Sequence, residues 1–106
     1  MTLTQLQYVV AIAETKSMNK AAAALFVSQP ALSGAIKDLE EELQTELFIR
    51  TNKGIVITTE GQEFLSYARQ MVELGNLVEE RFVNKTIAKK KFSVSMQHYS
   101  FAVEAF

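Results

Sequence analysis

The hydrophobic positions at the start of the chain recur every three or four residues, which is the spacing of one face of an α-helix. Thr2 and Gln5 precede this series with the pattern of a capping box, so the helix is predicted to begin beside them and to end near Lys16. A short second helix is predicted over 19–26, because that stretch is nearly all Ala and Leu and Ser17 can cap its start. The hydrophobic face of the first helix consists of Leu3, Leu6, Val10 and Ala13.

Pro30 determines where a third helix begins. Proline has no backbone N–H and a fixed φ, so it is tolerated only in a first helical turn, which makes Ser28 the N-cap of a helix that runs to about Leu43. The spacing along this helix gives it two different faces. The hydrophobic face consists of Leu32, Ile36, Leu39 and Leu43, and the polar face consists of Gln29, Ser33 and Lys37.

Residues 47–57 contain two short runs of β-branched and aromatic residues with turn-forming residues between them. Asn52 and Gly54 in that position predict a small β-hairpin, with Arg50 and Lys53 near its tip. The fold class predicted for this part is therefore mainly α, with three helices and a hairpin wing forming a winged helix-turn-helix.

A long helix is predicted from Thr59 to about Asn84. Thr59 and Gln62 have the capping-box pattern, and small or hydrophobic residues then recur at alternating spacings of four and three. At 1.5 Å per residue this helix is roughly 39 Å long, too long for so small a core to cover, so its stripe is expected to pack against a second copy of the chain. The predicted dimerisation stripe consists of Phe64, Ala68, Met71, Gly75, Val78 and Phe82.

The composition changes again near the C-terminal end. Lysines at 85 and 89–91 indicate an exposed hinge, and 92–96 alternates strictly as one half-buried strand that lacks a partner. We therefore predict three parts: a winged helix-turn-helix over 1–58, a linker and dimerisation helix over 59–85, and a hinge with the truncated start of a further domain over 86–106.

Charge first argues against a nucleic-acid partner, because 11 basic residues face 12 acidic ones and the net charge is -1. The charges are segregated, however. The helical segments before residue 38 carry a small excess of lysine, and Arg50 and Lys53 follow the acidic stretch. A polyanion can bind these basic residues only if the acidic stretch faces away from them. The acidic stretch consists of Asp38, Glu40, Glu41, Glu42 and Glu46, which we interpret as a solvated back face.

Several classes of protein are excluded or disfavoured. The chain has no cysteine, so disulfides, thiolate metal sites and cysteine nucleophiles are excluded. Its longest hydrophobic run, 21–27, falls far short of the ~20 residues that cross a bilayer, and no secretory signal is evident, so we expect a cytoplasmic protein without a membrane partner. His98 lies far from any candidate nucleophile and no phosphate-binding glycine loop occurs, so neither an enzyme nor a metal or cofactor site is predicted.

The polar face of the third helix is the best candidate for function. Ser28, Gln29, Ser33 and Lys37 could enter the major groove of double-stranded DNA, where Gln and Ser side chains contact base edges and the helix N-terminus contacts phosphate. Cations of the hairpin could reach neighbouring phosphates or the minor groove. The plain alternative is a three-helix core whose polar residues and hairpin cations are merely solvated.

The stretch from Ser28 to Leu65 contains the blocks S-Q-P-A-L-S, I-x-x-L-E-x-E-L, L-F-x-R-T and T-x-x-G. With these blocks, residues 1–85 closely resemble the N-terminal winged helix-turn-helix and linker helix of LysR-type transcriptional regulators. The resemblance implies a homodimeric, sequence-specific DNA-binding transcription regulator, with a higher oligomer left open for the full-length protein. It also implies an effector-binding domain that takes a small-molecule effector and is almost wholly missing here. The implied DNA contacts are Ser28, Gln29, Pro30, Ser33, Lys37, Arg50 and Lys53.

Three positions depart from the family pattern. Gln44 stands where the family usually has Gly, so the chain either avoids a left-handed conformation there or accepts a cost of roughly 1 kcal/mol. Gly34 replaces a longer polar side chain, and Lys53 replaces an Arg. The alternative function is a protein-interaction module that uses the long amphipathic helix, with the winged head as a scaffold.

Overall fold

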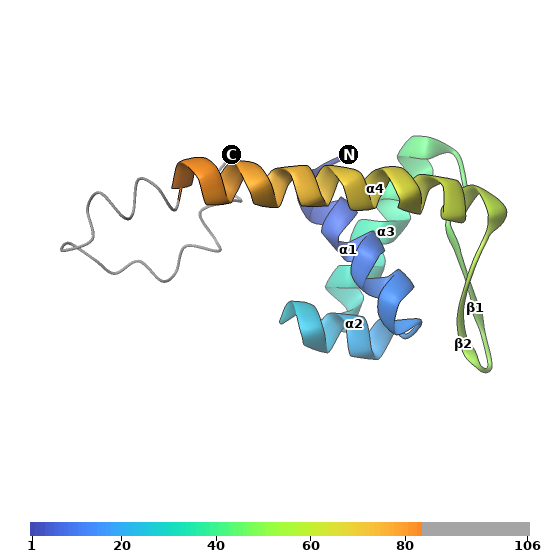
Figure 1. Cartoon of the computed structure of the whole chain (residues 1–106). Coiled ribbons are helices and arrows are strands. Elements are labelled where there is room, and N and C mark those ends of the chain that lie inside the picture. Colours follow the sequence, from blue (N-terminus) through green and yellow to red (C-terminus); the bar gives the residue numbers. More distant parts are fainter. Residues whose placement is uncertain (84–106) are drawn as a thin grey trace. The chain divides into compact units, whose positions relative to one another are not determined.

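The computed structural model describes residues 1–83 (Figure 1). The chain divides into two compact units, Met1–Val72 and Glu73–Phe106, and each is described by itself. The predicted fold class, mainly helical with a small two-stranded sheet, is confirmed. The predicted hinge and the strand over 92–96 lie outside the described residues. The elements in chain order are α1 (Leu3–Thr15), α2 (Met18–Leu25), α3 (Gln29–Leu43), β1 (Phe48–Thr51), β2 (Gly54–Ile57), α4 (Thr59–Val78) and the π-helical η1 (Glu79–Val83).

The first three helices begin where their capping residues predict. Thr2 and Gln5 form the complete capping box, with the Gln5 N–H donating to the Thr2 Oγ1 at 3.1 Å and the Thr2 N–H donating to the Gln5 Oε1 at 2.9 Å. The Ser17 hydroxyl oxygen accepts from the N–H of Lys20, and that of Ser28 accepts from the N–H of Ala31. These bonds satisfy backbone donors that a helix leaves unpaired at its N-terminus.

Each of the first three helices ends in a residue with left-handed backbone geometry. Lys16, Phe26 and Gln44 have φ values of 55°, 59° and 55°, although none of them is glycine. Gln44 therefore adopts the left-handed conformation and accepts its cost. Its side chain offsets part of that cost, because the Gln44 Nε2 donates to the carbonyl oxygen of Glu41 at 2.7 Å.

The core of the first unit is built around α1, which packs against α2, α3 and β2. Because α1 is enclosed on several sides, its buried face differs from the predicted stripe. Val9 and Ile12 are fully buried, whereas Leu3 and Val10 pack only at the margin. The buried side chains of this core are Leu6, Val9, Ile12, Ala13, Met18, Ala21, Ala22, Leu32, Ile36, Leu39, Leu47, Ile55, Leu65 and Ala68.

The hairpin formed by β1 and β2 docks on the end of α1. The strands are antiparallel, with Thr51 opposite Gly54. Gly54 has a φ of 123° and lies so close to α1 that a Cβ atom there would be 2.9 Å from the carbonyl oxygen of Lys16, so only glycine fits. The N–H of Ile55 donates to the same oxygen at 3.2 Å, and the Ile55 side chain enters the core.

The start of α4 corrects the predicted capping box, because Thr58 and not Thr59 caps the helix. The Thr58 Oγ1 accepts from the N–H of Gly61 at 2.9 Å and donates to the carbonyl oxygen of Glu46 at 2.7 Å, and the Thr58 N–H donates to the carbonyl oxygen of Leu47 at 3.0 Å. Thr58 is therefore the residue that the loop before β1 holds in place.

The helix after residue 58 differs from the predicted uniform helix at its far end. α4 continues to Val78, and the last five described residues, Glu79–Val83, form a π-helical turn instead of a further α-helical one. None of the helices formed by residues 1–83 is long and apolar enough to span a membrane.

Candidate nucleic-acid interface

The N-terminal half of α3 exposes short, uncharged side chains. Ser28 and Pro30 are exposed, and Gln29 and Ser33 are half-buried at the edge of the helix. Gly34 adds a bare patch of backbone, because a Cβ atom built there would meet nothing within 4 Å. A surface of this kind lets a flat partner, such as the edge of a base pair, come close to the helix.

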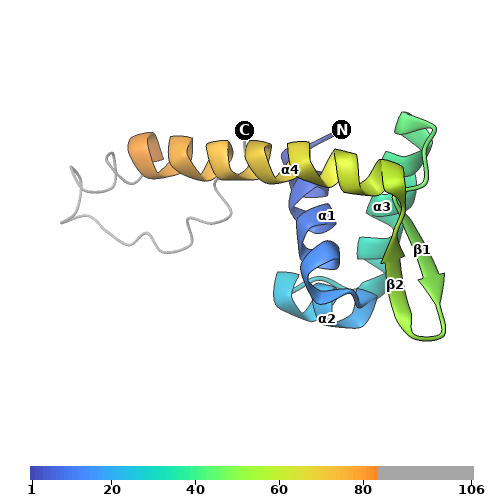
Figure 2. The same ribbon diagram turned by 45° about the vertical axis from the view of Figure 1, so that its right-hand side comes forward.

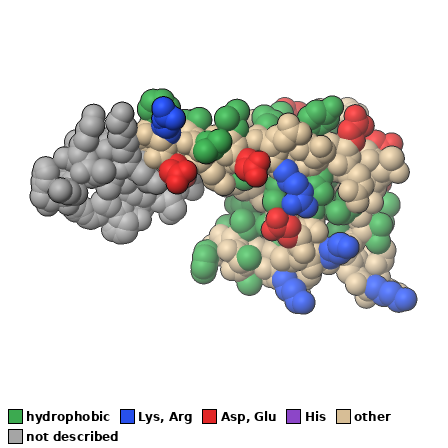
Figure 3. All heavy atoms as spheres, viewed as in Figure 1, with side chains coloured by type: hydrophobic (Ala, Val, Ile, Leu, Met, Phe, Trp, Pro, Cys, Tyr) green, Lys and Arg blue, Asp and Glu red, His purple; other side chains and the backbone are tan. Residues whose placement is uncertain are grey.

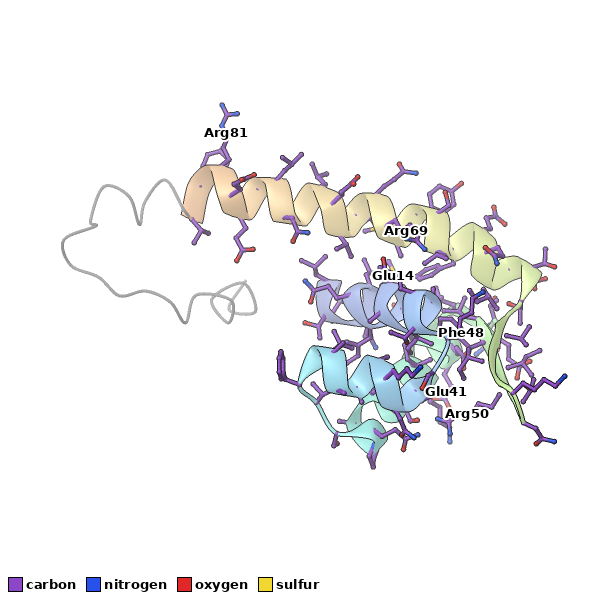
Figure 4. The ribbon with its side chains drawn as sticks, turned by 60° about the horizontal axis from the view of Figure 1, so that its bottom comes forward. Glu14, Glu41, Phe48, Arg50, Arg69 and Arg81 are labelled. Carbon is purple, nitrogen blue, oxygen red and sulfur yellow. The ribbon has the colours of Figure 1, made fainter. Side chains whose placement is uncertain are left out.

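A side chain of the hairpin joins this surface. The Arg50 side chain, labelled in Figure 4, donates a hydrogen bond through its Nη2 to the Ser33 Oγ. Arg50 lies in β1 opposite Ile55, one residue before the end of the strand and so near the hairpin tip, as predicted. Lys53 is in the two-residue turn and is exposed. Arg50 and Ser33 thus bring the predicted contacts of the wing and of α3 together.

A shallow hollow of about 270 Å³ lies between α3 and β1. Its polar rim includes Ser33, Lys37 and Arg50, and its floor includes hydrophobic side chains of the core. Two cations and a hydroxyl outweigh the single carboxylate of the lining, that of Glu40, so the excess of positive charge favours an anionic partner. The residues that line the hollow are Met18, Ser33, Ile36, Lys37, Glu40, Phe48 and Arg50.

Glu40 corrects the interpretation of the acidic stretch as a wholly solvated face. Asp38, Glu41, Glu42 and Glu46 are exposed as predicted, whereas Glu40 is half-buried. Its Oε2 accepts hydrogen bonds from two backbone N–H groups, those of Leu47 at 2.8 Å and Phe48 at 3.1 Å. Glu40 therefore fixes the start of β1 against α3. Its sequence signal was the four-residue spacing from a core position, Ile36, which placed it at the edge of the buried face.

The carboxylates lie at the other end of α3 from the hairpin tip. Figures 1 and 2 show α3 rising from the level of α2 and the hairpin toward the start of α4, so its acidic last turns point away from the hairpin tip. Figure 3 shows basic side chains along the lower edge of the same unit, over α2 and the end of the hairpin. Lys16, Lys20 and Lys53 are among the exposed cations. The segregation of charge along the sequence thus becomes a segregation in space.

Two ion pairs reduce the free charge elsewhere. The N-terminal ammonium of Met1 lies 2.6 Å from the Glu42 Oε1. The Arg69 Nη1 lies 3.4 Å from the Glu14 Oε2, and these two side chains are labelled in Figure 4. Both pairs are largely exposed, and exposed pairs contribute little to stability.

The predicted dimerisation stripe is split by the structure. Ala68 has no accessible surface and lies in the core of its own chain, so it cannot contact a second copy, and Phe64 packs partly against that core. Met71 is 45% exposed. In the second unit, Gly75 is half-buried, and Val78 and Phe82 are exposed. Periodicity could not separate core positions from partner positions, since both recur every three or four residues.

Several exposed hydrophobic residues were missed in the sequence. Phe26, in the turn between α2 and α3, is 93% exposed. Tyr67 is exposed on α4 in the first unit, and Leu74 and Leu77 are exposed in the second. The last three follow the same helical spacing as Met71, which was the signal available for them.

Three packed helices, with a capped third helix beside a two-stranded hairpin, define a winged helix-turn-helix. The family model for "Bacterial regulatory helix-turn-helix protein, lysR family" matches residues 3–62. The chain belongs to the LysR family, as its motifs indicated.

Known relatives agree with this membership. The chain is similar to an "Uncharacterized HTH-type transcriptional regulator YxjO" of Bacillus subtilis (strain 168), with 40% identity over 74 residues, which are 70% of this chain and 25% of that protein. It is also 41% identical over 81 residues to the "HTH-type transcriptional regulator BudR" of Klebsiella aerogenes, covering 76% of this chain and 57% of that protein. The chain spans only about a quarter of the length of several relatives that it matches.

The solved structures similar to this chain include complexes with DNA. The structure titled "Crystal structure of CbnR_DBD-DNA complex" matches with a TM-score of 0.73 and 36% identity, over 81% of this chain and 99% of that one. The structure titled "Crystal Structure of BenM_DBD/catB site 1 DNA Complex" matches with a TM-score of 0.70 and 40% identity, over 83% and 97% of the two chains.

Proposed function

We propose that this chain is the DNA-binding part of a transcription regulator and that it recognises a sequence in double-stranded DNA. The observation that carries the proposal is the carboxylate-free half of α3, which is joined to the hairpin by the bond between Arg50 and Ser33. The similar domains that were solved with DNA support it. The proposed action is non-covalent: it needs no catalytic group and no cofactor, and it takes place in the cytoplasm.

In this proposal the N-terminal half of α3 enters the major groove. Gln29 and Ser33 then contact base edges, and Lys37 lies near the backbone. The free N–H groups at the start of α3, beside Ser28 and Pro30, face a phosphate. Lys53 in the hairpin turn contacts the flanking backbone. The phosphate contacts supply affinity and the base contacts supply sequence preference.

The test separates affinity from preference. Sequences bound by the wild-type chain are selected from a random duplex pool, and binding is then measured at several salt concentrations. We expect Gln29→Ala to change the selected sequence, with a loss of ~1–3 kcal/mol at the contacted base. We expect Lys53→Ala to weaken binding to all sequences evenly and to lower the salt slope by about 1. Glu41→Gln, at the acidic end of α3, is the control and should leave the selected sequence unchanged.

The competing function, a protein-interaction module, makes the opposite prediction. Such a module needs no salt-sensitive affinity for random duplex. Absence of that affinity in the wild-type chain, or an identical selected sequence for Gln29→Ala, would overturn the groove assignment.

We further propose that two copies pair through the helix that follows residue 58. Exposed hydrophobic side chains on α4 support this, including Tyr67 and Met71 in the first unit and Leu77 in the second. Two α3 helices would then reach half-sites about one helical turn of DNA apart, roughly 34 Å.

The oligomeric state in solution tests the pairing. We expect the wild-type chain to sediment as a dimer at micromolar concentration and Met71→Glu to shift it toward a monomer, since a buried charge opposes association. Gln70→Glu introduces glutamate at the adjacent, exposed position 70 and should leave the dimer intact. A monomeric wild-type chain would contradict the proposal, and a higher oligomer would extend it.

A further inference from the structure

The bond between Arg50 and Ser33 has a fixed direction. A guanidinium carries five N–H donors and no acceptor, so the Ser33 Oγ can only accept from it. Within residues 1–83 the Ser33 side chain makes no other hydrogen bond. Its own O–H donor is therefore unused, while one of its two acceptor positions is occupied.

This arrangement changes what the hydroxyl offers to a partner. A serine hydroxyl alone can donate or accept equally well. When its oxygen accepts from a cation, the O–H bond is polarised, so the group becomes a stronger donor and a weaker acceptor. Ser33 beside Arg50 is thus biased toward donating.

The surroundings of Ser33 allow it to meet a base edge directly. Gly34 leaves the next position bare, with no atom within 4 Å of a built Cβ. Ser33 itself lies on the rim of the hollow between α3 and β1, together with Lys37 and Arg50. Its hydroxyl is therefore accessible from outside and held from the hairpin side.

We propose that Arg50 is a positioning residue that sets the direction of base recognition by Ser33. The inference rests on the proposed function, and it specifies the chemistry of one contact. The Ser33 hydroxyl donates to a hydrogen-bond acceptor in the major groove, which is a purine N7, a guanine O6 or a thymine O4. It discriminates against cytosine on the contacted strand, because cytosine presents only its N4 donor there.

A contact from Arg50 to a phosphate alone would leave a different signature. Phosphate contacts carry no sequence information, so losing one weakens binding to all sequences. The experiment must therefore measure base preference at the contacted position, because affinity alone does not distinguish the two roles of Arg50. Lys53 supplies the matched control, because it is a cation of the same hairpin whose side chain has no bond to α3.

Selection from a random duplex pool is carried out with the wild-type chain, Arg50→Ala, Arg50→Lys, Ser33→Ala and Lys53→Ala. In the wild type we expect one position of each half-site to exclude cytosine by about tenfold, and Ser33→Ala to remove this exclusion. Arg50→Ala should also remove it, since the freed hydroxyl can then accept from cytosine. Arg50→Lys should restore part of it, and Lys53→Ala should leave it unchanged.

A chemical probe tests the same contact without changing the protein fold. If the selected base is adenine, replacing its N7 by carbon should weaken wild-type binding several-fold and have no effect on Ser33→Ala. If it is guanine, replacing either its N7 by carbon or its O6 by sulfur should do so. If it is thymine, replacement of its O4 by sulfur serves the same purpose. Thermal unfolding of each variant checks that the exposed Arg50 is not needed for folding.

The possible outcomes separate this inference from the proposed function. If the wild-type chain selects no sequence, the proposed function itself fails. If it selects a sequence but Arg50→Ala keeps the exclusion of cytosine, or if cytosine is the preferred base, DNA binding stands and the role of Arg50 is overturned.

Discussion

The two halves of α3 bury the same kind of side chain but expose different ones. Leu32 in the first half and Leu39 in the second are both fully buried, so the helix contributes to the core along its length. The exposed side of the first half is short, polar and free of carboxylates. The second half is acidic, and one of its carboxylates, Glu40, holds the start of β1. A negative net charge is therefore compatible with a surface for DNA, because the position of the charges along one helix matters more than their sum.

Truncation of a core side chain should have the largest effect on stability. This effect should not depend on whether the exposed side of the helix is uncharged or acidic. Leu39→Ala removes a side chain with no accessible surface, and we expect it to lower the free energy of unfolding by about 2–5 kcal/mol. Urea denaturation measures the loss. Ser33→Ala, in the exposed first half, should change stability by less than about 0.5 kcal/mol. Similar losses of stability for both variants would contradict the assignment of Leu39 to the core and of Ser33 to the surface.

Glu40 provides a sharper comparison within the acidic half. Glu40→Ala leaves the backbone N–H groups of Leu47 and Phe48 without their acceptor, and we expect a loss of about 1–3 kcal/mol. Hydrogen exchange of those two amides should accelerate as well. The exposed neighbour Glu41 is the matched control, and Glu41→Ala should cost less than about 0.5 kcal/mol. Equal losses of stability for the two variants would mean that Glu40 is an ordinary solvated residue and does not hold the start of β1.

The C-terminal end of α3 carries strain that glycine should relieve. Gln44 has a φ of 55°, and Gln44→Gly should raise the free energy of unfolding by about 1 kcal/mol, reduced somewhat by the lost side-chain bond to Glu41. Gln44→Ala keeps the left-handed cost and loses the bond, so it should be less stable than the wild type. Thermal denaturation of the three proteins gives the order, and a destabilised Gln44→Gly would contradict it.

The bare patch in the first half should tolerate an added methyl group. Gly34→Ala should raise the free energy of unfolding by roughly 0.5–1 kcal/mol, because alanine favours the helix and its Cβ meets open space. Gly61→Ala is the contrasting control, since a Cβ there would overlap the carbonyl oxygen of Leu47 and should destabilise the protein. If Gly34→Ala also proved destabilising, the space beside α3 would not be open.

The elements of this fold could be predicted from local chemistry. Capping by Thr2, Ser17 and Ser28 gave the helix starts, and the turn at Asn52 gave the hairpin. These signals lie within a few residues of the feature that they determine. The cap of α4 was misplaced by one residue because Thr58 and Thr59 are both capping residues, and only the distant Leu47 and Glu46 distinguish them.

The candidate site was predicted less completely, because its contacts join residues far apart in the sequence. The polar face with Gln29 and Ser33 followed from helical spacing. The bond from Arg50 to Ser33 and the clamp formed by Glu40 depend on how the hairpin docks, which no local pattern specifies. The burial of Ala68 was missed for the same reason, since spacing alone does not tell which neighbour covers a face.

The start of α4 has a consequence for dissecting the chain. Gly61 presses directly on the carbonyl oxygen of Leu47, and Leu65 and Ala68 complete the hydrophobic core. A fragment that ends at Thr58 would therefore expose hydrophobic core side chains to water and would tend to aggregate. The smallest fragment that folds on its own must therefore keep at least the first three turns of α4. A hinge in this helix cannot lie within these turns.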